Sequence, residues 1–456
     1  MRNILIIGAG RSATSLIKYL LDKSEAEELF ITIGDLNIEH AQKFTADHPN
    51  GRGILLDVFN ESQRKEAVEM ADLVISMLPA RYHIEVAHDC IEFGKHMVTA
   101  SYISDQMQLL DSKAKAKGLI FMNEIGLDPG IDHMSAMQII DRVRDNGGKM
   151  LLFESFTGGL IAPESDNNLW NYKFTWNPRN VVLAGQGGAA EFIQEGKYKY
   201  IPYHRLFRRT EFIDVAGYGK FEVYANRNSL KYQSVYGLEN ILTLYRGTIR
   251  RVGFSKAWNM FVQLGMTDDT YYIPDSETLT YRDFVNSFLP YSPTDSVELK
   301  LRHNLKIDQD DVMWEKLLDL DIFNDQKVIG IKEATPAQAL QKILEDKWTL
   351  AKDDKDMIVM YHKFGYELNG KKHQIDSHMV AMGDDQTYTA MAKTVGLPVA
   401  IAALKILNEE ITTPGVQLPI AKEVYEPILK ELEDLGIIFK ETEVPYLGYN
   451  PANVAG

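Results

Sequence analysis

Short, mainly apolar segments recur in the first quarter of the chain, and each is followed by residues with helical spacing. The segments lie at residues 4–7, 29–33, 53–56, 72–76, 96–99 and 119–122, and the first is apolar throughout. Apolar runs of this length are typical of strands that are buried on both faces. Strands and helices that alternate in this way predict a Rossmann-type doubly wound parallel sheet.

The first apolar run leads directly into a glycine turn. Residues 8–13 read G-A-G-R-S-A. The first glycine permits a tight turn, the second lets backbone N–H groups approach a pyrophosphate, and Ala13 still allows the helix to pack closely on the sheet. The second run ends near Asp35, about 20 to 25 residues beyond the glycines, where a carboxylate accepts hydrogen bonds from an adenosine ribose. This spacing predicts a dinucleotide site; the alternative is a packing turn, with Asp35 as the cap of the next helix.

Other candidate residues follow the remaining predicted strands. Ligands of parallel α/β sheets bind beyond the carboxyl ends of the strands. Residues 57–58, 77–79, 100–102 and 123–130 occupy those positions. We therefore expect the nicotinamide half of the cofactor and the substrate to lie beside these segments.

The pattern changes after Gly147. Residues 150–156, 218–225 and 357–360 predict strands of a second sheet, and Asn369-Gly370 predicts a hairpin turn. Between residues 255 and 348 the spacing is mostly helical, and Thr335-Pro336 predicts the start of a helix. The small residues of segment 391–404 predict a helix suited to close packing.

Composition and charge limit the function. The 456 residues include 49 Lys and Arg against 64 Asp and Glu, which gives a formal charge of −15. This charge disfavours nucleic acid or an anionic membrane as the main partner, so an anionic substrate requires a local group of arginines. Cys90 is the single cysteine, and no Cys/His cluster has the spacing of zinc ligands. We therefore expect no metal site. The N-terminus is not leader-like and no run of eighteen apolar residues occurs, so we expect a cytoplasmic protein.

Ten motifs identify a family. The sequence resembles the glutamate-forming saccharopine dehydrogenases, also called saccharopine reductases, over nearly its whole length. The motifs are ISMLP at 75–79, TASYIS at 99–104, MNEIGLDPGIDH at 122–133, GGL at 158–160, APE at 162–164, YKFTW at 172–176, NR at 226–227, RGT at 246–248, HKFG at 362–365 and TVG at 394–396.

The resemblance implies an activity and an architecture. The activity is reversible hydride transfer, in which saccharopine, NAD(P)⁺ and water give glutamate, 2-aminoadipate 6-semialdehyde and NAD(P)H. The architecture is an α/β fold with a Rossmann-type domain (1–127 plus 390–456), a mixed-sheet domain for substrate and dimerisation (128–254 plus 355–389) and a small helical domain (255–354). We therefore expect a homodimer.

The resemblance also assigns site residues, and most lie at the predicted strand ends. The predicted cofactor contacts are Gly8, Ala9, Gly10, Arg11, Ser12, Ala13, Asp35, Leu36, Asp57, Val58, Met77, Leu78, Ala100, Leu127 and Pro129. The predicted substrate contacts are Ser101, Tyr102, Arg227, Thr248, Ile249 and Arg250.

Two of these segments hold candidates for catalysis. Asp128 follows the sixth predicted strand, where a carboxylate can hold the substrate amine or take its proton; the alternative is helix capping. Tyr102 can hydrogen-bond the reacting nitrogen or a hydrolytic water; the alternative is a partly buried aromatic. Saccharopine bears three carboxylates, which makes Arg227 and Arg250 suitable clamps. Without the resemblance, the alternative for either arginine is a surface or salt-bridged residue, which is then favoured over a clamp. His133 is expected to be a packed core histidine.

Asp35 leads to a prediction about the cofactor. Fungal relatives have basic or small residues near the 2′-phosphate, and a carboxylate there both accepts ribose hydroxyls and repels a phosphate. We therefore predict NAD in preference to NADP. Two other functions stay open, a related secondary-amine dehydrogenase of the carboxynorspermidine type and a non-catalytic NAD-binding regulator.

Overall fold

The computed structural model describes residues 1–45, 48–450 and 454–455. The chain divides into two compact units, one formed by Met1–Gly148 and Met379–Lys440, the other by Lys149–His378 and Glu441–Gly456. The predicted Rossmann-type domain extends to residue 456. Its residues 451–453 and 456 lie outside the described residues. The separate helical domain stays a prediction, and its residues belong to the second unit.

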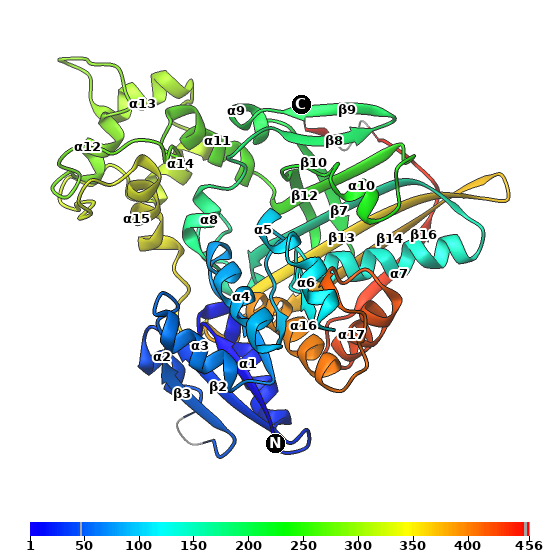
Figure 1. Ribbon diagram of the computed structural model, residues 1–456. Coiled ribbons are helices and arrows are strands. Elements are labelled where there is room, and N and C mark those ends of the chain that lie inside the picture. The colour runs from blue at the N-terminus through cyan, green and yellow to red at the C-terminus, as the bar shows by residue number, and fades with distance from the viewer. Residues whose placement is uncertain (46–47, 451–453, 456) are drawn as a thin grey trace. The chain divides into compact units, whose positions relative to one another are not determined.

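The first unit contains a parallel sheet of seven strands (Figure 1). The strands are β1 (Arg2–Ile7), β2 (Leu29–Asp35), β3 (Gly51–Leu55), β4 (Leu73–Ser76), β5 (His96–Val98), β6 (Ile120–Met122) and β15 (Gly415–Gln417). Their order is β15-β6-β5-β4-β1-β2-β3. The first six are the strands that the apolar runs predict, in the order of a dinucleotide fold, and β15 joins from the C-terminal part of the chain.

Helices cover both faces of this sheet. They are η1 (Arg11–Ala13), α1 (Thr14–Lys23), α2 (Ile38–Gln42), α3 (Glu61–Glu69), η2 (Ala80–Tyr82), α4 (His83–Phe93), α5 (Asp105–Gln108), α6 (Asp111–Ala116), α7 (Ile131–Asp145), α16 (Ala390–Leu407) and α17 (Lys422–Asp434). On one face, side chains of α3 to α6 join the strands in an apolar cluster that includes Leu5, Val74, Cys90 and Phe121. Cys90 is fully buried, and burial raises the pKa of its thiol.

The other face is covered by α1 and α16, which contact each other and the strands. At Gly396 an added Cβ atom would lie 3.0 Å from Leu16 and 3.1 Å from the carbonyl oxygen of Ser12. The glycine therefore permits α16 to approach the helix that follows the glycine turn. Within the described chain, α16 is the one helix long and apolar enough to cross a membrane, but 78% of it is buried inside the protein, as in a core helix.

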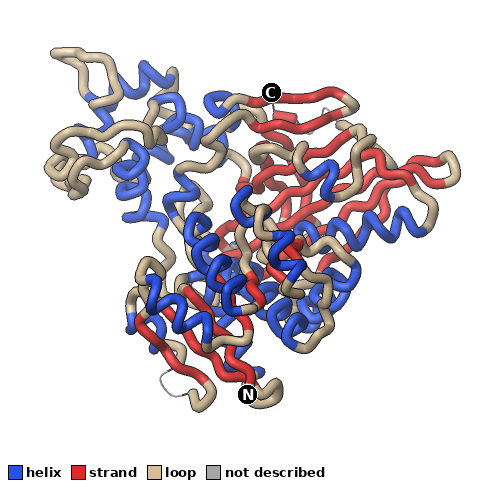
Figure 2. The backbone as a smooth tube through the Cα atoms, viewed as in Figure 1, coloured by secondary structure: helices blue, strands red, loops and turns tan. Residues whose placement is uncertain are grey.

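The second unit contains a mixed sheet of ten strands (Figure 2). They are β7 (Lys149–Ile161), β8 (Ala190–Gln194), β9 (Lys197–Ile201), β10 (Thr210–Val215), β11 (Gly219–Ala225), β12 (Thr243–Arg251), β13 (Asp356–Leu368), β14 (Lys371–Met382), β16 (Phe439–Val444) and β17 (Val454–Ala455). β7 and β12 pair in parallel, whereas β13, β11 and β10 pair with their neighbours antiparallel. The predicted hairpin turn joins β13 and β14, with positive φ at both Asn369 and Gly370.

Short helices connect these strands, and a helical segment lies between β12 and β13. The helices are η3 (Pro163–Ser165), α8 (Pro178–Val182), α9 (Tyr203–Leu206), α10 (Tyr232–Val235), α11 (Phe254–Leu264), α12 (Tyr281–Asn286), α13 (Val297–Leu305), α14 (Val312–Asp319) and α15 (Pro336–Trp348). Thr335 caps α15 as predicted, and it forms a capping box with Gln338.

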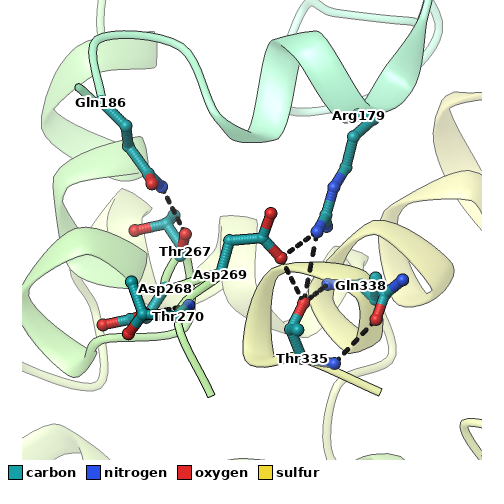
Figure 3. Close-up of polar contacts among 8 residues, drawn as sticks. All are labelled: Arg179, Gln186, Thr267, Asp268, Asp269, Thr270, Thr335 and Gln338. Atoms are coloured by element: carbon teal, nitrogen blue, oxygen red, sulfur yellow. Dashed lines mark hydrogen bonds and ion pairs between the residues drawn. The ribbon is translucent and has the colours of Figure 1, made fainter. Parts of the chain in front are cut away.

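A polar cluster ties this helical segment to the residues around α8 (Figure 3). The Arg179 guanidinium donates to Asp269 and to Thr335 Oγ1, and the Thr335 hydroxyl donates to the same Asp269 carboxylate. Gln186 donates to the carbonyl oxygen of Thr267. The N-terminus of α15 and the loop after α11 are therefore held by the chain that precedes β8.

Candidate active site

The glycine turn joins β1 to η1, and its two glycines have different surroundings. Gly8 has φ of +101°, and an added Cβ would lie 3.0 Å from the Met77 carbonyl oxygen. Gly10 has φ of −71°, and a Cβ there would meet nothing within 4 Å. Packing within the protein therefore requires a glycine at position 8, whereas at position 10 the missing side chain leaves open space.

That open space lies at the N-terminus of a helix. Neither Gly10 nor Ala13, which precede η1 and α1, provides a side-chain cap. Uncapped backbone N–H groups and the helix dipole favour an anion. The turn therefore fits the pyrophosphate of a dinucleotide, which the N–H groups around Gly10 would hold.

Asp35, the last residue of β2, supports the glycine turn. Its Oδ2 accepts a hydrogen bond from the Ala9 backbone N–H at 2.8 Å, and its Oδ1 accepts one from Asn37 N–H at 2.8 Å. The cap of α2 is Asn37, so the predicted alternative of Asp35 as a helix cap is wrong. Both carboxylate oxygens thus have backbone partners.

A buried ion pair holds the Asp57–Val58 loop, and sequence reasoning did not single out its residues. Asp57 Oδ1 accepts from Phe59 N–H at 2.9 Å. Arg64 donates to the Val58 carbonyl oxygen and to Asp89 Oδ2, each at 2.5 Å. Arg64 and Asp89 are both buried, so this pair fixes the chain at the end of β3.

Tyr102 lies in a loop after β5 that we call the tyrosine loop (residues 101–103). It is 38% exposed, so a partly buried aromatic describes its surroundings, and its catalytic role stays a prediction. Glu124 binds the backbone on both sides of the tyrosine: its N–H donates to the Ser101 carbonyl oxygen at 3.0 Å, and its Oε1 accepts from Ile103 N–H at 3.0 Å. The backbone that carries Tyr102 is therefore fixed while its ring stays accessible.

Glu124 has a second partner on α7. Its Oε2 lies 3.0 Å from Nε2 of His133, which is fully buried as predicted. On the opposite side of the tyrosine loop, the buried His83 lies 2.7 Å from Ser101 Oγ. Sequence reasoning did not predict that Glu124 and His83 hold the tyrosine loop. Two signals were present: Glu124 belongs to the family motif at 122–133, and the ISMLP motif at 75–79 ends four residues before His83.

Asp128 lies in a tight turn between β6 and α7. Gly126 N–H donates to the Pro129 carbonyl oxygen at 2.9 Å, and a Cβ at Gly130 would clash with Gly126 at 2.1 Å. α7 begins at Ile131 with Gly130 as its cap residue, so Asp128 precedes the cap. The turn places the partly buried Asp128 beyond the end of β6.

The predicted substrate contacts of the second unit lie on and beside β12. Thr248 pairs with Thr157 of β7 and with Tyr224 of β11. The Arg250 side chain is 4% exposed and lies near three aromatic rings, those of Tyr172, Tyr224 and Phe254. Its Nη1 donates to the Ile249 carbonyl oxygen at 2.9 Å, and its buried Nε has no hydrogen-bond partner.

Arg250 thus carries a buried charge that no carboxylate of the described residues neutralises. Burying an unpaired charge is costly unless an opposite charge joins it. Arg227 differs, because it is exposed, has φ of +41° and makes no side-chain bond to any residue within the described ranges. Both guanidinium groups therefore have donors available for a ligand.

The two sets of predicted residues belong to different units. All predicted cofactor contacts, together with Ser101, Tyr102 and Asp128, lie in the first unit, and Arg227, Thr248, Ile249 and Arg250 lie in the second. In the first unit the structure places the glycine turn, Asp35, Met77 and the tyrosine loop at the carboxyl ends of the strands. The roles of individual residues stay predictions.

Comparison with known proteins decides the family. The family model for the C-terminal domain of saccharopine dehydrogenase matches residues 126–437, and the model for its NADP binding domain matches residues 4–122. The chain belongs to the saccharopine dehydrogenase family. It is therefore an oxidoreductase of the Rossmann type, as the resemblance predicts.

Individual relatives agree with this family. Saccharopine dehydrogenase [NADP(+), L-glutamate-forming] of Schizosaccharomyces pombe is 34% identical over 452 residues, which cover 97% of this chain and 99% of that protein. The mitochondrial alpha-aminoadipic semialdehyde synthase of Rattus norvegicus is also 34% identical, but the match spans only 47% of its length. The solved structure of apo saccharopine dehydrogenase (L-Glu forming) from Saccharomyces cerevisiae has a TM-score of 0.88 at 31% identity, covering 98% of this chain and all of that one.

The comparisons correct the predicted cofactor preference. The matching domain is described as NADP binding, and the relatives from S. pombe and S. cerevisiae are named as NADP(+) enzymes. The prediction of NAD over NADP is therefore wrong. The position of Asp35 gives a physical reason for this error. The prediction assumed that its carboxylate accepts hydrogen bonds from the ribose hydroxyls, but its two oxygens accept from the Ala9 and Asn37 N–H groups.

Proposed function

We propose that this protein catalyses the reversible oxidation of saccharopine to glutamate and 2-aminoadipate 6-semialdehyde, with NADP as the hydride acceptor, in lysine metabolism. The full-length likeness to glutamate-forming saccharopine dehydrogenases supports this reaction. The observation on this chain that carries most weight is Arg250, a buried guanidinium with no acidic partner among the described residues. A substrate with three carboxylates supplies the missing negative charge.

The chemistry requires a base or proton acceptor near the amine and a place for water. Oxidation removes a hydride from the carbon beside the secondary amine and a proton from the nitrogen, which leaves a carbon–nitrogen double bond. Water adds to that carbon, and the carbon–nitrogen bond then breaks to release glutamate and the semialdehyde. Asp128 and Tyr102, which follow β6 and β5, are the residues that we propose for holding the amine and for these proton transfers.

NADP supplies the hydride acceptor when it is bound in the first unit. We propose that backbone N–H groups around Gly10 hold its pyrophosphate, because this turn leaves the helix N-terminus uncapped. Arg11 is exposed and forms no ion pair within the described part of the chain, which makes it our candidate for the 2′-phosphate. An arginine is well matched to a phosphate because its planar fork donates two hydrogen bonds.

A substrate panel tests the proposed function. Saccharopine, carboxynorspermidine and simpler secondary-amine dicarboxylates would be assayed for NADPH formation. We expect saccharopine to be oxidised with at least about tenfold higher kcat/KM than carboxynorspermidine, because the arginines match its carboxylates. Glutamate should form one for one with NADPH. Equal or reversed efficiencies would contradict the saccharopine assignment, and no turnover of any amine would favour a non-catalytic regulator.

Two further parts of the proposal concern the state of the protein in the cell. We propose a homodimer, by analogy with the family, and a cytoplasmic location, from the acidic composition and the single cysteine. Light scattering coupled to size-exclusion chromatography tests the first, and fluorescence microscopy of the tagged protein tests the second.

A further inference from the structure

His83 lies beneath the predicted substrate loop without belonging to any predicted contact. It is the first residue of α4 and is 4% exposed. Its Nδ1 lies 2.8 Å from the hydroxyl of Ser76, the last residue of β4, and its Nε2 lies 2.7 Å from the hydroxyl of Ser101. One imidazole thus joins the ends of two adjacent strands.

The ring carries no charge at neutral pH. Burial lowers the pKa of His83 to about 4. A neutral imidazole has one N–H donor and one acceptor nitrogen. The ring can therefore donate to only one of the two serines and must accept from the other.

The choice of donor changes what Ser101 can offer to a ligand. The Ser101 hydroxyl has a single proton. If the serine donates that proton to His83 Nε2, its oxygen can only accept from a ligand. If Nε2 instead donates to Ser101 Oγ, the serine keeps its proton and can donate it. A carboxylate only accepts hydrogen bonds, so an acidic substrate requires the second arrangement.

Thr99 lies beside this arrangement without replacing it. Its Oγ1 accepts from the Ser101 backbone N–H at 3.3 Å and lies 3.4 Å from His83 Nε2. The Nε2–Oγ distance to Ser101 is shorter, at 2.7 Å. Ser101 is therefore the main partner of Nε2.

We propose that His83 is a positioning residue: its Nε2–H donates to Ser101 Oγ, so that the Ser101 hydroxyl is presented as a donor to a substrate carboxylate. The Ser76 hydroxyl selects this tautomer by donating to Nδ1. The three residues form a directed hydrogen-bond chain from β4 to the tyrosine loop. This inference rests on the proposed function, because saccharopine supplies the carboxylate.

The competing explanation is that His83 only fills the space under α4. In that case its replacement should lower the melting temperature and weaken NADPH binding together with catalysis. A positioning role instead affects the substrate side, so KM for saccharopine should rise while NADPH affinity stays the same.

Two substitutions of His83 separate these explanations. The amide nitrogen of His83→Gln lies near the former Nε2 and can still donate to Ser101, whereas His83→Asn reaches only the position of Nδ1. Loss of a hydrogen bond to a charged ligand corresponds to roughly tenfold to a hundredfold in affinity. We expect His83→Asn to raise the saccharopine KM by about tenfold or more, and His83→Gln to restore most of the loss.

Ser101→Ala provides the double-mutant cycle. If His83 acts through Ser101, the His83→Asn, Ser101→Ala double variant should have nearly the same KM as Ser101→Ala alone. Additive losses would overturn the proposal. Ser76→Ala removes only a hydroxyl, so it can replace the His83 variants in this test if they fold poorly. It should raise the saccharopine KM by less than His83→Asn does and leave NADPH affinity unchanged.

A spectroscopic measurement tests the tautomer directly. The protein has 11 histidines, and the ring of His83 can be assigned in ¹⁵N spectra by its loss in His83→Gln. We expect a neutral ring protonated at Nε2 at pH 7, and a ring protonated at Nδ1 would overturn the proposal. The ¹⁵N measurement needs no substrate, so it decides the tautomer whether or not the protein oxidises saccharopine. A lack of saccharopine turnover would instead count against the proposed function.

Discussion

Glu124 and His133 form a buried pair in which Oε2 of the glutamate lies 3.0 Å from Nε2 of the histidine. The other carboxylate oxygen, Oε1, accepts from the Ile103 backbone N–H at 3.0 Å. Glu124 therefore joins α7 to the tyrosine loop, and it does so from a backbone position with φ of +53°. The arrangement explains how an exposed tyrosine can sit on a fixed backbone.

Replacing Glu124 should loosen this loop. Glu124→Ala leaves the Ile103 N–H and the His133 ring without their carboxylate, so we expect a loss of about 2–4 kcal/mol in stability and a reduced kcat with saccharopine. Glu124→Gln keeps an acceptor oxygen for Ile103 and should lose less. Thermal melting and steady-state kinetics measure both effects, and Glu69→Ala, an exposed glutamate of the same unit, is the matched control. Equal losses in the alanine and glutamine variants would contradict this account.

The two glycines of the turn should respond differently to alanine. Gly10→Ala has an allowed φ and free space, so the melting temperature should stay near that of the wild type. Its added methyl group lies where we place the pyrophosphate, and NADPH should bind at least about tenfold more weakly. Gly8→Ala combines a positive φ with a contact to Met77, so it should destabilise the fold by about 1–3 kcal/mol. Unchanged NADPH affinity in Gly10→Ala would show that the cofactor does not approach this turn.

Arg227 should act on the substrate alone. If its guanidinium holds a carboxylate in both the ground and transition states, Arg227→Ala should raise the saccharopine KM, by about 2–4 kcal/mol in binding free energy, and change kcat much less. Arg227→Lys should also be impaired, because an ammonium group cannot form two parallel hydrogen bonds. Saccharopine kinetics, NADPH affinity and melting temperature would be measured together, with the exposed Arg208→Ala as control. A lower melting temperature with normal kinetics would indicate a structural role instead.

The second unit should lose stability as the pH rises. Burial, together with the neighbouring Glu154 carboxylate, raises the pKa of Glu211 to about 7. Between pH 4.5 and 7 the folded protein therefore keeps a proton that the unfolded chain has released, so the free energy of unfolding falls as pH increases through this window. The effect is on the order of 2–3 kcal/mol.

Glu211→Gln tests this pH dependence. The neutral amide does not titrate, so the variant should be more stable than the wild type at pH 8, and the difference should shrink toward pH 5. Melting temperatures across this range measure it, and the exposed Glu277→Gln is the control. A stability difference that stays constant with pH would mean that Glu211 is not the titrating group.

Local sequence was sufficient for much of this fold. The mainly apolar segments predict six of the seven strands of the parallel sheet, because a strand buried on both faces is largely apolar. The edge strand β3 is only partly buried. The Asn369-Gly370 turn and the Thr335 cap were predicted for a similar reason, since both depend on the conformation of a few adjacent residues. The glycine turn belongs to the same class.

Only the tertiary structure shows which partners the polar side chains have. Asp35 stands at the expected distance from the glycines, yet its oxygens accept from Ala9 and Asn37, and the preference for NAD that we predicted from its position is wrong. His83 and Glu124 gave no local sign of their roles, because Ser101 is 18 residues from His83 and Ile103 is 21 residues from Glu124. Sequence spacing determines which residues follow each strand, but hydrogen bonds between different strand ends depend on sheet order, which brings these ends together in space.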